Sequence, residues 1–325
     1  MALPAALDRP LRLPVVASPM FIASGPDLVK AQCQAGVIGA FPALNARPQT
    51  LLDDWLHEIA ESNAAFAAAH PEAPVGPFAV NQIVHRSNDR LEADMDLVVK
   101  HEVPIVITSL GARPEINEAV HSYGGIVLHD VINDRFAHKA IEKGADGLIA
   151  VAAGAGGHAG TLSPFALVQE IRRWFDGPLL LSGAMAHGRS ILAALAAGAD
   201  FAYVGSAFLA THEANTVEDY KRMIVDSSAD DIVYSSLFTG VHGNYLRGSI
   251  EAAGLDPANL PDGDVSTMSF GSGDAGGEAK AWRDIWGSGQ GIGAVDAVVS
   301  AGELVDRLAA EFAEARASLD ERLSR

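Results

Sequence analysis

The chain has 325 residues, a net charge of −18 and 49% hydrophobic residues, enough to bury the core of one large domain or two ordinary ones. A surface this acidic repels phosphate backbones, which argues against nucleic acid as a partner. The single cysteine, Cys33, excludes an internal disulfide and a cysteine-based zinc site, and we predict no metal site. The N-terminal stretch carries prolines and charges, and no run of about 18 uncharged apolar residues occurs, so we expect a cytoplasmic protein without membrane contact.

Eight short apolar runs with the character of β-strands recur along the chain. Several of them are apolar without alternation, which is typical of strands that are covered on both faces. The predicted strands span residues 13–18, 36–41, 77–82, 104–109, 125–130, 146–152, 178–183 and 200–206.

Helical patterns lie between these runs, at residues 26–35, 48–70, 133–144, 163–175 and 188–198. Pro26 falls in a first helical turn, Asn133 is a predicted N-cap, and Gly144 and Gly198 end two of the helices. Eight successive strand–helix units favour a (β/α)8 TIM barrel within the α/β class. A doubly wound sheet is the alternative.

The repeating pattern stops after Ala210. Residues 211–290 combine helical and loop patterns with many glycines, and we interpret them as a cap or lid inserted after strand 8. Residues 294–325 have a helical pattern that is expected to close the fold. The predicted organisation is therefore a cofactor-binding barrel over 1–210, a cap over 211–290 and a C-terminal helical segment over 291–325. The sequence does not indicate an oligomeric state.

Two glycine-rich turns predict a phosphate site. In barrels, the loops after strands seven and eight often bind phosphate through backbone N–H groups and a helix N-terminus. Here these loops read SGAMAHGRSI and VGSAFL, and they supply Gly183, Gly188, Gly205 and Ser206. The loop after strand six, GAGGHAG, is then available for another task. Its histidine, His158, is our candidate catalytic residue, because histidine moves protons near neutral pH.

Polar or flexible residues also end other predicted strands. Met20 follows the first strand in ASPM, where its backbone could meet a flat ring, and Asn81 offers a carboxamide that suits the edge of a flavin or purine. His129 and Asp130 end the fifth strand, and His129 is a substrate-binding candidate. A turn, a helix cap or a structural pair is the alternative interpretation of these positions.

The predicted cap contains the stretch YSSLFTGVHGNYL, in which aromatic and polar residues gather. Tyr234, His242 and Tyr245 are the substrate-binding candidates in it, and ordinary cap packing is the alternative.

Taken together, these motifs resemble the nitronate monooxygenase family, formerly called 2-nitropropane dioxygenases. This is a family of FMN-dependent barrels that also includes NAD(P)H:quinone reductases and enoyl reductases. The resemblance covers essentially the whole chain, and it is carried by ASPM, VNQ, GAGGHAG, SGAMAHGRSI, YVGSAFLAT and WGSGQG.

The resemblance implies FMN as the cofactor and a role for each matching residue. His158 would be the catalytic base or an orienting donor, and Met20, Asn81 and Gly156 would contact the flavin. Gly183, Gly205 and Ser206 would hold the phosphate of FMN. The other implied cofactor contacts are Tyr203, Val204, Ser288, Gly289 and Gln290.

The implied reaction is the oxidation of alkyl nitronates, or of nitroalkanes, by O2 to a carbonyl compound and nitrite. An NAD(P)H-dependent flavin oxidoreductase of the quinone or enoyl reductase type is one alternative, and a flavin-binding protein without turnover is another. The chain departs from the family pattern at Val151 and Gly154, where the family has glutamine and glutamate. It also has His-Asp at the end of strand five, where many relatives have glutamine or lysine.

Overall fold

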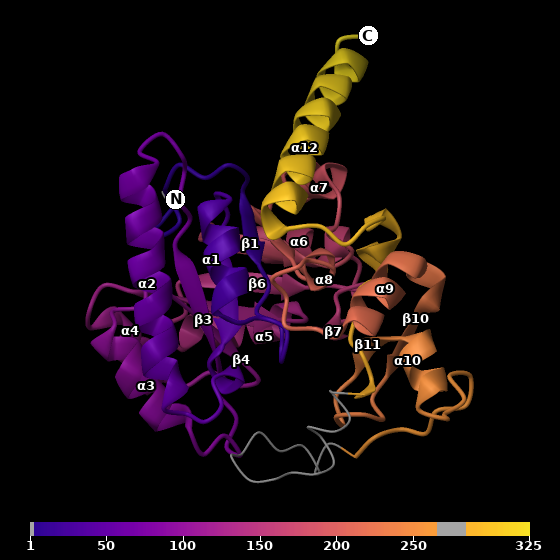
Figure 1. Ribbon diagram of the computed structural model, residues 1–325, viewed down its shortest axis with the longest axis horizontal. Coiled ribbons are helices and arrows are strands. Elements are labelled where there is room, and N and C mark those ends of the chain that lie inside the picture. Colours follow the sequence, from indigo (N-terminus) through magenta and orange to yellow (C-terminus); the bar gives the residue numbers. More distant parts are fainter. Residues whose placement is uncertain (1–2, 265–283) are drawn as a thin grey trace.

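The computed structural model describes residues 3–264 and 284–325. Its centre is a sheet of eight parallel strands in the order β1-β9-β8-β6-β5-β4-β3-β2 (Figure 1). A bridge between Val16 and Ile38 joins β1 to β2 and closes the sheet into a barrel. The strands are β1 Val15–Ala17, β2 Gly39–Pro42, β3 Phe78–Ile83, β4 Ile105–Ser109, β5 Ile126–Val131, β6 Gly147–Val151, β8 Leu179–Ser182 and β9 Phe201–Val204. The predicted TIM barrel and its eight strands are confirmed.

The barrel interior has two layers of different character. The layer farther from the C-terminal ends of the strands is an apolar cluster that includes Ile107, Leu128, Leu180 and Phe201. Because side chains alternate along a strand, the next inward positions lie two residues further on, at the C-terminal ends of the strands. Those positions form a polar layer on top of the apolar one, and they include Ser18, Asn81, Ser109, Asp130, Ser182 and Tyr203.

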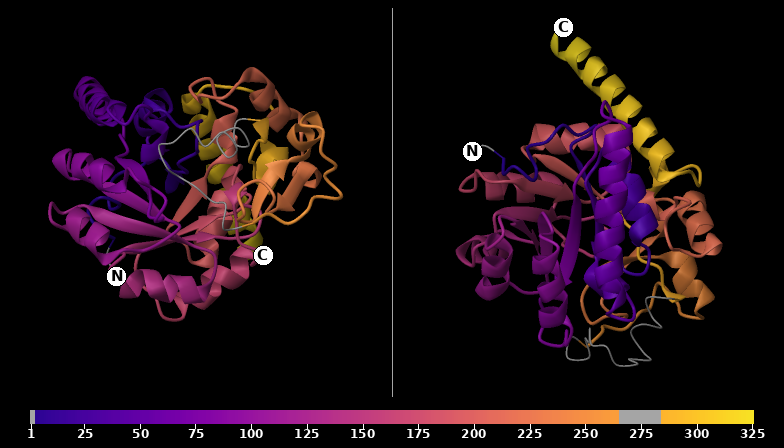
Figure 2. Two further views of the ribbon diagram at one scale, coloured as in Figure 1. Left: turned by 90° about the horizontal axis from the view of Figure 1, so that it is seen from below. Right: turned by 60° about the vertical axis from the view of Figure 1, so that its left-hand side comes forward.

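Helices surround the barrel, as Figure 2 shows from two further directions. Proline at the first turn starts α1, α4 and α6, the Asn133 side chain caps α5, and Gly198 in the left-handed conformation ends α7. The helices are α1 Pro26–Gln34, α2 Leu51–Ala69, α3 Leu91–Lys100, α4 Pro114–His121, α5 Asp134–Glu142, α6 Pro164–Arg172, α7 Gly188–Ala197, α8 Ser206–Leu209, α9 Glu218–Asp226, α10 Arg247–Ala252 and α12 Ala301–Leu323. The sequence analysis did not identify α3 and α4.

The segment after the barrel forms a small sheet of its own. Its strands are β10 Ile232–Ser235, β11 Gly243–Leu246 and β7 Gly157–His158, in the order β10-β11-β7. Since β7 belongs to the loop after β6, this sheet ties that loop to the region predicted as the cap. Residues 265–283 of the predicted cap lie outside the described residues.

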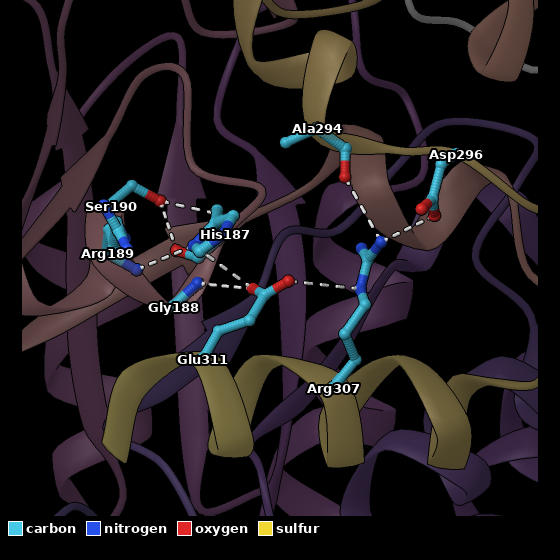
Figure 3. A network of polar contacts seen from close by, with 8 residues as sticks. All are labelled: His187, Gly188, Arg189, Ser190, Ala294, Asp296, Arg307 and Glu311. Atoms are coloured by element: carbon cyan, nitrogen blue, oxygen red, sulfur yellow. Dashed lines mark hydrogen bonds and ion pairs between the residues drawn. The ribbon is translucent and has the colours of Figure 1, made fainter. Parts of the chain in front are cut away.

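The C-terminal helix α12 packs on α7 and α1, and its distal turns project beyond the rest of the chain (Figure 1). Figure 3 shows how it meets the start of α7: a carboxylate oxygen of Glu311 accepts a hydrogen bond of 2.8 Å from the backbone of Gly188. Arg307 forms ion pairs with Glu311 and Asp296. A Cβ atom on Gly188 would lie 2.1 Å from the backbone nitrogen of Phe312, so this glycine permits the close helix contact. The N-terminus of α7 thus binds a carboxylate of the chain itself, which corrects the expectation that Gly188 contributes to a phosphate site.

No helix among the described residues is long and apolar enough to cross a membrane.

Candidate active site

A cavity of about 760 Å³ lies at the C-terminal ends of the barrel strands. Its floor is the polar layer of the barrel, and its walls are the loops that follow the strands. The residues predicted from the sequence that line it are Met20, Asn81, His129, Gly156, His158, Gly183, Tyr203, Gly205, Ser206 and Gly289. These residues come from six different strand ends and from the segment that follows α10, so the fold brings together positions that are far apart in the sequence.

One wall of the cavity consists of closely packed backbone. Gly183 has a φ of +132°, and a Cβ atom there would lie 2.6 Å from the carbonyl oxygen of Ala153. A Cβ atom on Gly156 would lie 2.8 Å from the backbone nitrogen of Gly289, which itself donates to Ser206 Oγ at 2.8 Å. Only glycine fits at Gly183 and Gly156, because a Cβ atom at either position would collide with neighbouring backbone of the wall.

Strained backbone also concentrates at the cavity. Ile22, Leu110 and Ala184 have positive φ angles of 67°, 59° and 55°, although none of them is glycine, and all three line the cavity. Such conformations are uncommon for residues with a side chain and cluster at ligand sites.

A chain of hydrogen bonds crosses the floor from β3 to β5. Asn81 Nδ2 donates to Ser109 Oγ at 2.7 Å, and Ser109 Oγ donates to Asp130 Oδ2 at 2.7 Å. The second amide hydrogen of Asn81 goes to the carbonyl oxygen of Ile107 at 3.1 Å. Both donors of this carboxamide are therefore used within the protein, and its oxygen is the atom that it can offer to a ligand.

Asp130 is a site residue that the sequence analysis did not select. Its carboxyl group belongs to the inward layer and lines the cavity, and burial raises its pKa to about 6 although the hydrogen bond from Ser109 acts in the opposite direction. The period of two along β5 could have identified it, because Leu128 belongs to the barrel interior and Asp130 follows it on the same face.

His129, which the sequence analysis selected on the same strand, alternates with Asp130 and hydrogen-bonds to Thr108 Oγ1 through Nδ1 at 2.6 Å. Only 7% of its surface is exposed. Burial and the nearby charge of Lys143 lower the pKa of His129 to about 4, so the ring is neutral at physiological pH. It contributes to the side of the cavity near α5, where Phe136 and Lys139 also line it.

His158 lies on β7, where Gly243 of β11 is its cross-strand partner. Its Nε2 atom is 2.9 Å from Thr239 Oγ1, and this hydroxyl donates to the carbonyl oxygen of Val241 at 3.0 Å. The Thr239 hydroxyl therefore bridges the imidazole ring and the backbone of Val241, and this contact fixes the orientation of the ring. Burial lowers the pKa of His158 to about 4.

Two aromatic residues missed by the sequence analysis complete the cavity wall. Tyr220 of α9 and Trp286 stack with ring centroids 4.9 Å apart, and both line the cavity. The Tyr220 hydroxyl donates to the carbonyl oxygen of Gly287. Both residues lie in the region that follows the barrel, where no strand or helix period indicates which side chains face the site.

The remaining predicted site residues are not part of the cavity lining. Val204 alternates with the inward-facing Tyr203 and is buried on the outer side of the barrel. Ser288 is fully buried, whereas Gln290 is exposed beside Gly154, where a Cβ atom would lie 3.0 Å from Gln290 Oε1. The Gln290 side chain therefore takes up space beside the position at which the family pattern has glutamate.

The three substrate candidates of the predicted cap have structural contacts elsewhere. Tyr234 and the exposed His242 stack on each other at 5.0 Å, and the Tyr234 hydroxyl donates to the carbonyl oxygen of Ala159. Tyr245 is 1% exposed and packs edge-on against Phe238 at 4.8 Å. Tyr234 and Tyr245 lie on opposite faces of the small sheet, and neither they nor His242 line the cavity. Val241 is the residue of this stretch that does.

The described residues contain no cluster of three or more His, Cys, Asp or Glu side chains that could hold a metal ion.

Comparison with known proteins shows what this arrangement is similar to. The nitronate monooxygenase of Paraburkholderia phytofirmans is 26% identical over 280 residues, which cover 75% of this chain and 76% of the relative. A Mycobacterium tuberculosis relative named as a monooxygenase is 30% identical over 55% of this chain, and the match spans about half of that relative's length, 47%. The crystal structure of a nitroalkane oxidase from Streptomyces ansochromogenes superposes with a TM-score of 0.77 at 25% identity, covering 95% of this chain and 98% of that one.

The profile of the Nitronate monooxygenase family matches residues 77–311, which include β3 to β9, the loop with His158 and most of the segment that follows the barrel. The match therefore extends over more than half of the chain, including most of the cavity lining described above. The chain belongs to the nitronate monooxygenase family, as the resemblance of its motifs predicted.

Proposed function

We propose that this chain is a cytoplasmic, FMN-dependent enzyme that oxidises alkyl nitronates, and nitroalkanes after loss of a proton, with O2 to a carbonyl compound and nitrite. The observation that carries the proposal is the placement of a neutral histidine, His158, on the wall of a cavity whose glycine-lined side and polar floor suit a flavin. Membership of the family supports a flavin-dependent oxidoreductase.

The residues present fit FMN. The cavity of about 760 Å³ is large enough for a flavin and a small substrate. The wall at Gly183, Gly205 and Ser206 suits the phosphate, because backbone and a hydroxyl face the cavity there. The carboxamide oxygen of Asn81 suits a ring N–H of the isoalloxazine. When bound, FMN supplies the redox chemistry by accepting electrons from the substrate.

The protein's own residues bind the substrate and move its proton. The neutral ring of His158 takes the carbon-bound proton of a nitroalkane, while the contact between its Nε2 atom and Thr239 Oγ1 holds the ring in place. General base catalysis of this kind contributes typically ~10²–10⁴-fold to the rate. A preformed nitronate has already lost that proton, so for this substrate His158 serves only to orient the anion. Tyr220 and Trp286 restrict access of water on the side of α9.

The test is anaerobic reduction of the yellow protein. Separate samples receive propionate 3-nitronate, an alkyl nitronate, NADH or NADPH, and the flavin absorbance is followed. We expect rapid bleaching by a nitronate and, on admission of O2, formation of nitrite. Bleaching by NADH or NADPH alone would instead indicate an NAD(P)H-dependent reductase, and a yellow protein that reacts with none of them would indicate flavin binding without turnover.

A further inference from the structure

Asp130 is a partly buried carboxyl group that forms no ion pair within the described residues. Within residues 3–264 and 284–325, no Lys, Arg or His side chain forms an ion pair with it. Its recorded side-chain partner is a neutral hydroxyl, Ser109 Oγ, which donates to Oδ2 at 2.7 Å. A carboxylate removed from water and left unpaired is strongly disfavoured, and it relieves this cost by taking up a proton.

The groups that surround Asp130 determine whether its carboxyl group is charged or protonated. On β4 and β3, Ser109 and Asn81 form the neutral hydrogen-bond chain already described, and on β9 the Tyr203 hydroxyl lies near enough that the Asp130 charge raises the pKa of Tyr203, after the larger effect of burial. Val151 is the neighbouring inward residue on β6 and carries no charge. Besides Asp130, the titratable groups on the cavity wall are Arg47, His129, Lys139, Lys143, His158, Tyr203 and Tyr220. Burial lowers the pKa of His129 to about 4, so this neighbouring ring is neutral.

Two of the cations on the wall, Arg47 and Lys143, donate hydrogen bonds to carbonyl oxygens. Arg47 Nε donates to the carbonyl oxygen of Leu44 at 3.0 Å, and Lys143 Nζ donates to that of Ala112 at 2.7 Å. His158 is neutral because burial lowers its pKa to about 4. Two hydrogen bonds favour the charged form of Asp130, one from Ser109 Oγ and one from the backbone of Asp130 itself, and burial outweighs both.

A flavin ring in the cavity would disfavour the charged form further, because it would cover the side of Asp130 that lines the cavity. The isoalloxazine carries two carbonyl oxygens and unprotonated ring nitrogens, which accept hydrogen bonds. A carboxylate has only acceptors and would repel them, whereas a protonated carboxyl group offers one donor. A flavin is therefore expected to bind better to the protein in which Asp130 is neutral.

We propose that Asp130 is a cofactor-binding residue that holds a proton and donates it as a hydrogen bond to the bound flavin, so that flavin binding is coupled to proton uptake at this site. This inference rests on the proposed flavin site. Asp130 supplies the donor only in its protonated form, which makes the affinity depend on pH.

The direction of the pH dependence follows from the linkage between proton binding and flavin binding. If the neutral form binds the flavin and the charged form does not, the affinity weakens about tenfold for each pH unit above the pKa of Asp130 in the free protein. Burial raises that pKa to about 6. The dissociation constant should then rise roughly tenfold or more between pH 6 and pH 8.

The experiment titrates the deflavinated full chain with riboflavin at pH 5.5, 6, 7 and 8 and follows the quenching of flavin fluorescence. Riboflavin is the primary probe because it lacks the phosphate of FMN, whose own ionisation falls in the same range, and FMN is titrated in parallel. The variants are Asp130→Asn, which cannot titrate, and Ser109→Ala. Glu142→Gln on the exposed face of α5 is the matched control for the loss of one negative charge.

We expect the Asp130→Asn variant to bind riboflavin with less than about a twofold change over this range, and Glu142→Gln to behave as the unaltered protein. Ser109→Ala removes a donor that favours the charged carboxylate and so raises the pKa of Asp130. The affinity for riboflavin should therefore begin to weaken at a higher pH than in the unaltered protein. This second variant keeps the test valid if Asp130→Asn does not fold. A flat profile in the unaltered protein, or the same slope in Asp130→Asn, would overturn the inference. No flavin binding at any pH would instead contradict the proposed function itself.

Discussion

Replacement of His158 tests both its chemistry and its charge. His158→Ala should keep bound flavin, because the wall around Gly183 and the floor around Asn81 do not depend on this side chain. Since burial lowers the pKa of His158 to about 4, the ring is about 99.9% neutral at pH 7 and only about one tenth protonated at pH 5. The rate per bound flavin in the unaltered protein should therefore show no loss of the base near pH 6.5, the pKa of an exposed histidine.

The assay measures nitrite release per bound flavin from pH 5 to 8 with a neutral nitroalkane and with its preformed nitronate. His158→Ala should lose roughly 10²-fold or more with the nitroalkane and much less with the nitronate, because proton removal is needed only for the first. His242→Ala is the matched control, since His242 is exposed and is not part of the cavity lining. Equal rates for His158→Ala and the unaltered protein on both substrates would remove His158 from the mechanism, and loss of flavin with normal turnover of the remainder would make it a structural residue.

Three further outcomes are expected. Gly183→Ala should yield protein with little flavin absorbance, because its Cβ atom would lie 2.6 Å from Ala153 O and displace the cavity wall. Gly124→Ala, also at a positive φ but with no atom within 4 Å, should stay yellow. Equal flavin content in the two variants would contradict a role of the wall at Gly183 in flavin binding. The free energy of unfolding, measured in urea, should fall between pH 7.5 and 5.0 by about 2 kcal/mol less in His129→Asn than in the unaltered protein. The neutral buried ring stabilises the fold above the unfolded pKa of 6.5, and this stabilisation is lost as the pH falls toward the folded pKa of about 4. Parallel pH profiles of the two proteins would contradict this prediction. Cys33, fully buried and with a pKa raised by burial to about 12, should resist thiol reagents in the native protein and react after denaturation, and fast reaction in the native state would argue against this packing.

The barrel could be predicted because its strands are covered on both faces. A run such as residues 104–109 has no polar alternation to confuse it with a surface strand, and its observed bounds, Ile105–Ser109, differ by one residue. The hydrophobic pattern was less informative at the end of β5, where two polar residues follow the apolar run. His129 and Asp130 are adjacent and both polar, so only the phase of the apolar residues before them distinguishes the residue that faces the cavity from its neighbour.

The glycines of the loop after β8 show a different limit of prediction from sequence. Gly183 and Gly188 lie in one short motif, and each is a glycine for a different physical reason. Gly183 needs its positive φ and lies on the cavity wall, whereas Gly188 allows Phe312 of α12 to approach and donates to Glu311. That partner is more than 120 residues away along the chain, so the local sequence cannot distinguish the two functions.

The geometry of His158 depends on contacts that are just as remote. Its backbone is held by Gly243 and its ring by Thr239, more than 80 residues later in the sequence. A change in the β10–β11 region therefore acts on the histidine even where the altered side chain does not reach the substrate. Variation in this region would alter the position of the base together with Val241 on the cavity wall. In the proposed mechanism, the position of the histidine and that of Val241 on the cavity wall therefore depend on one small sheet. Substitutions at Thr239 should change the rate for nitroalkanes more than the flavin content, measured as nitrite release and as absorbance per protein.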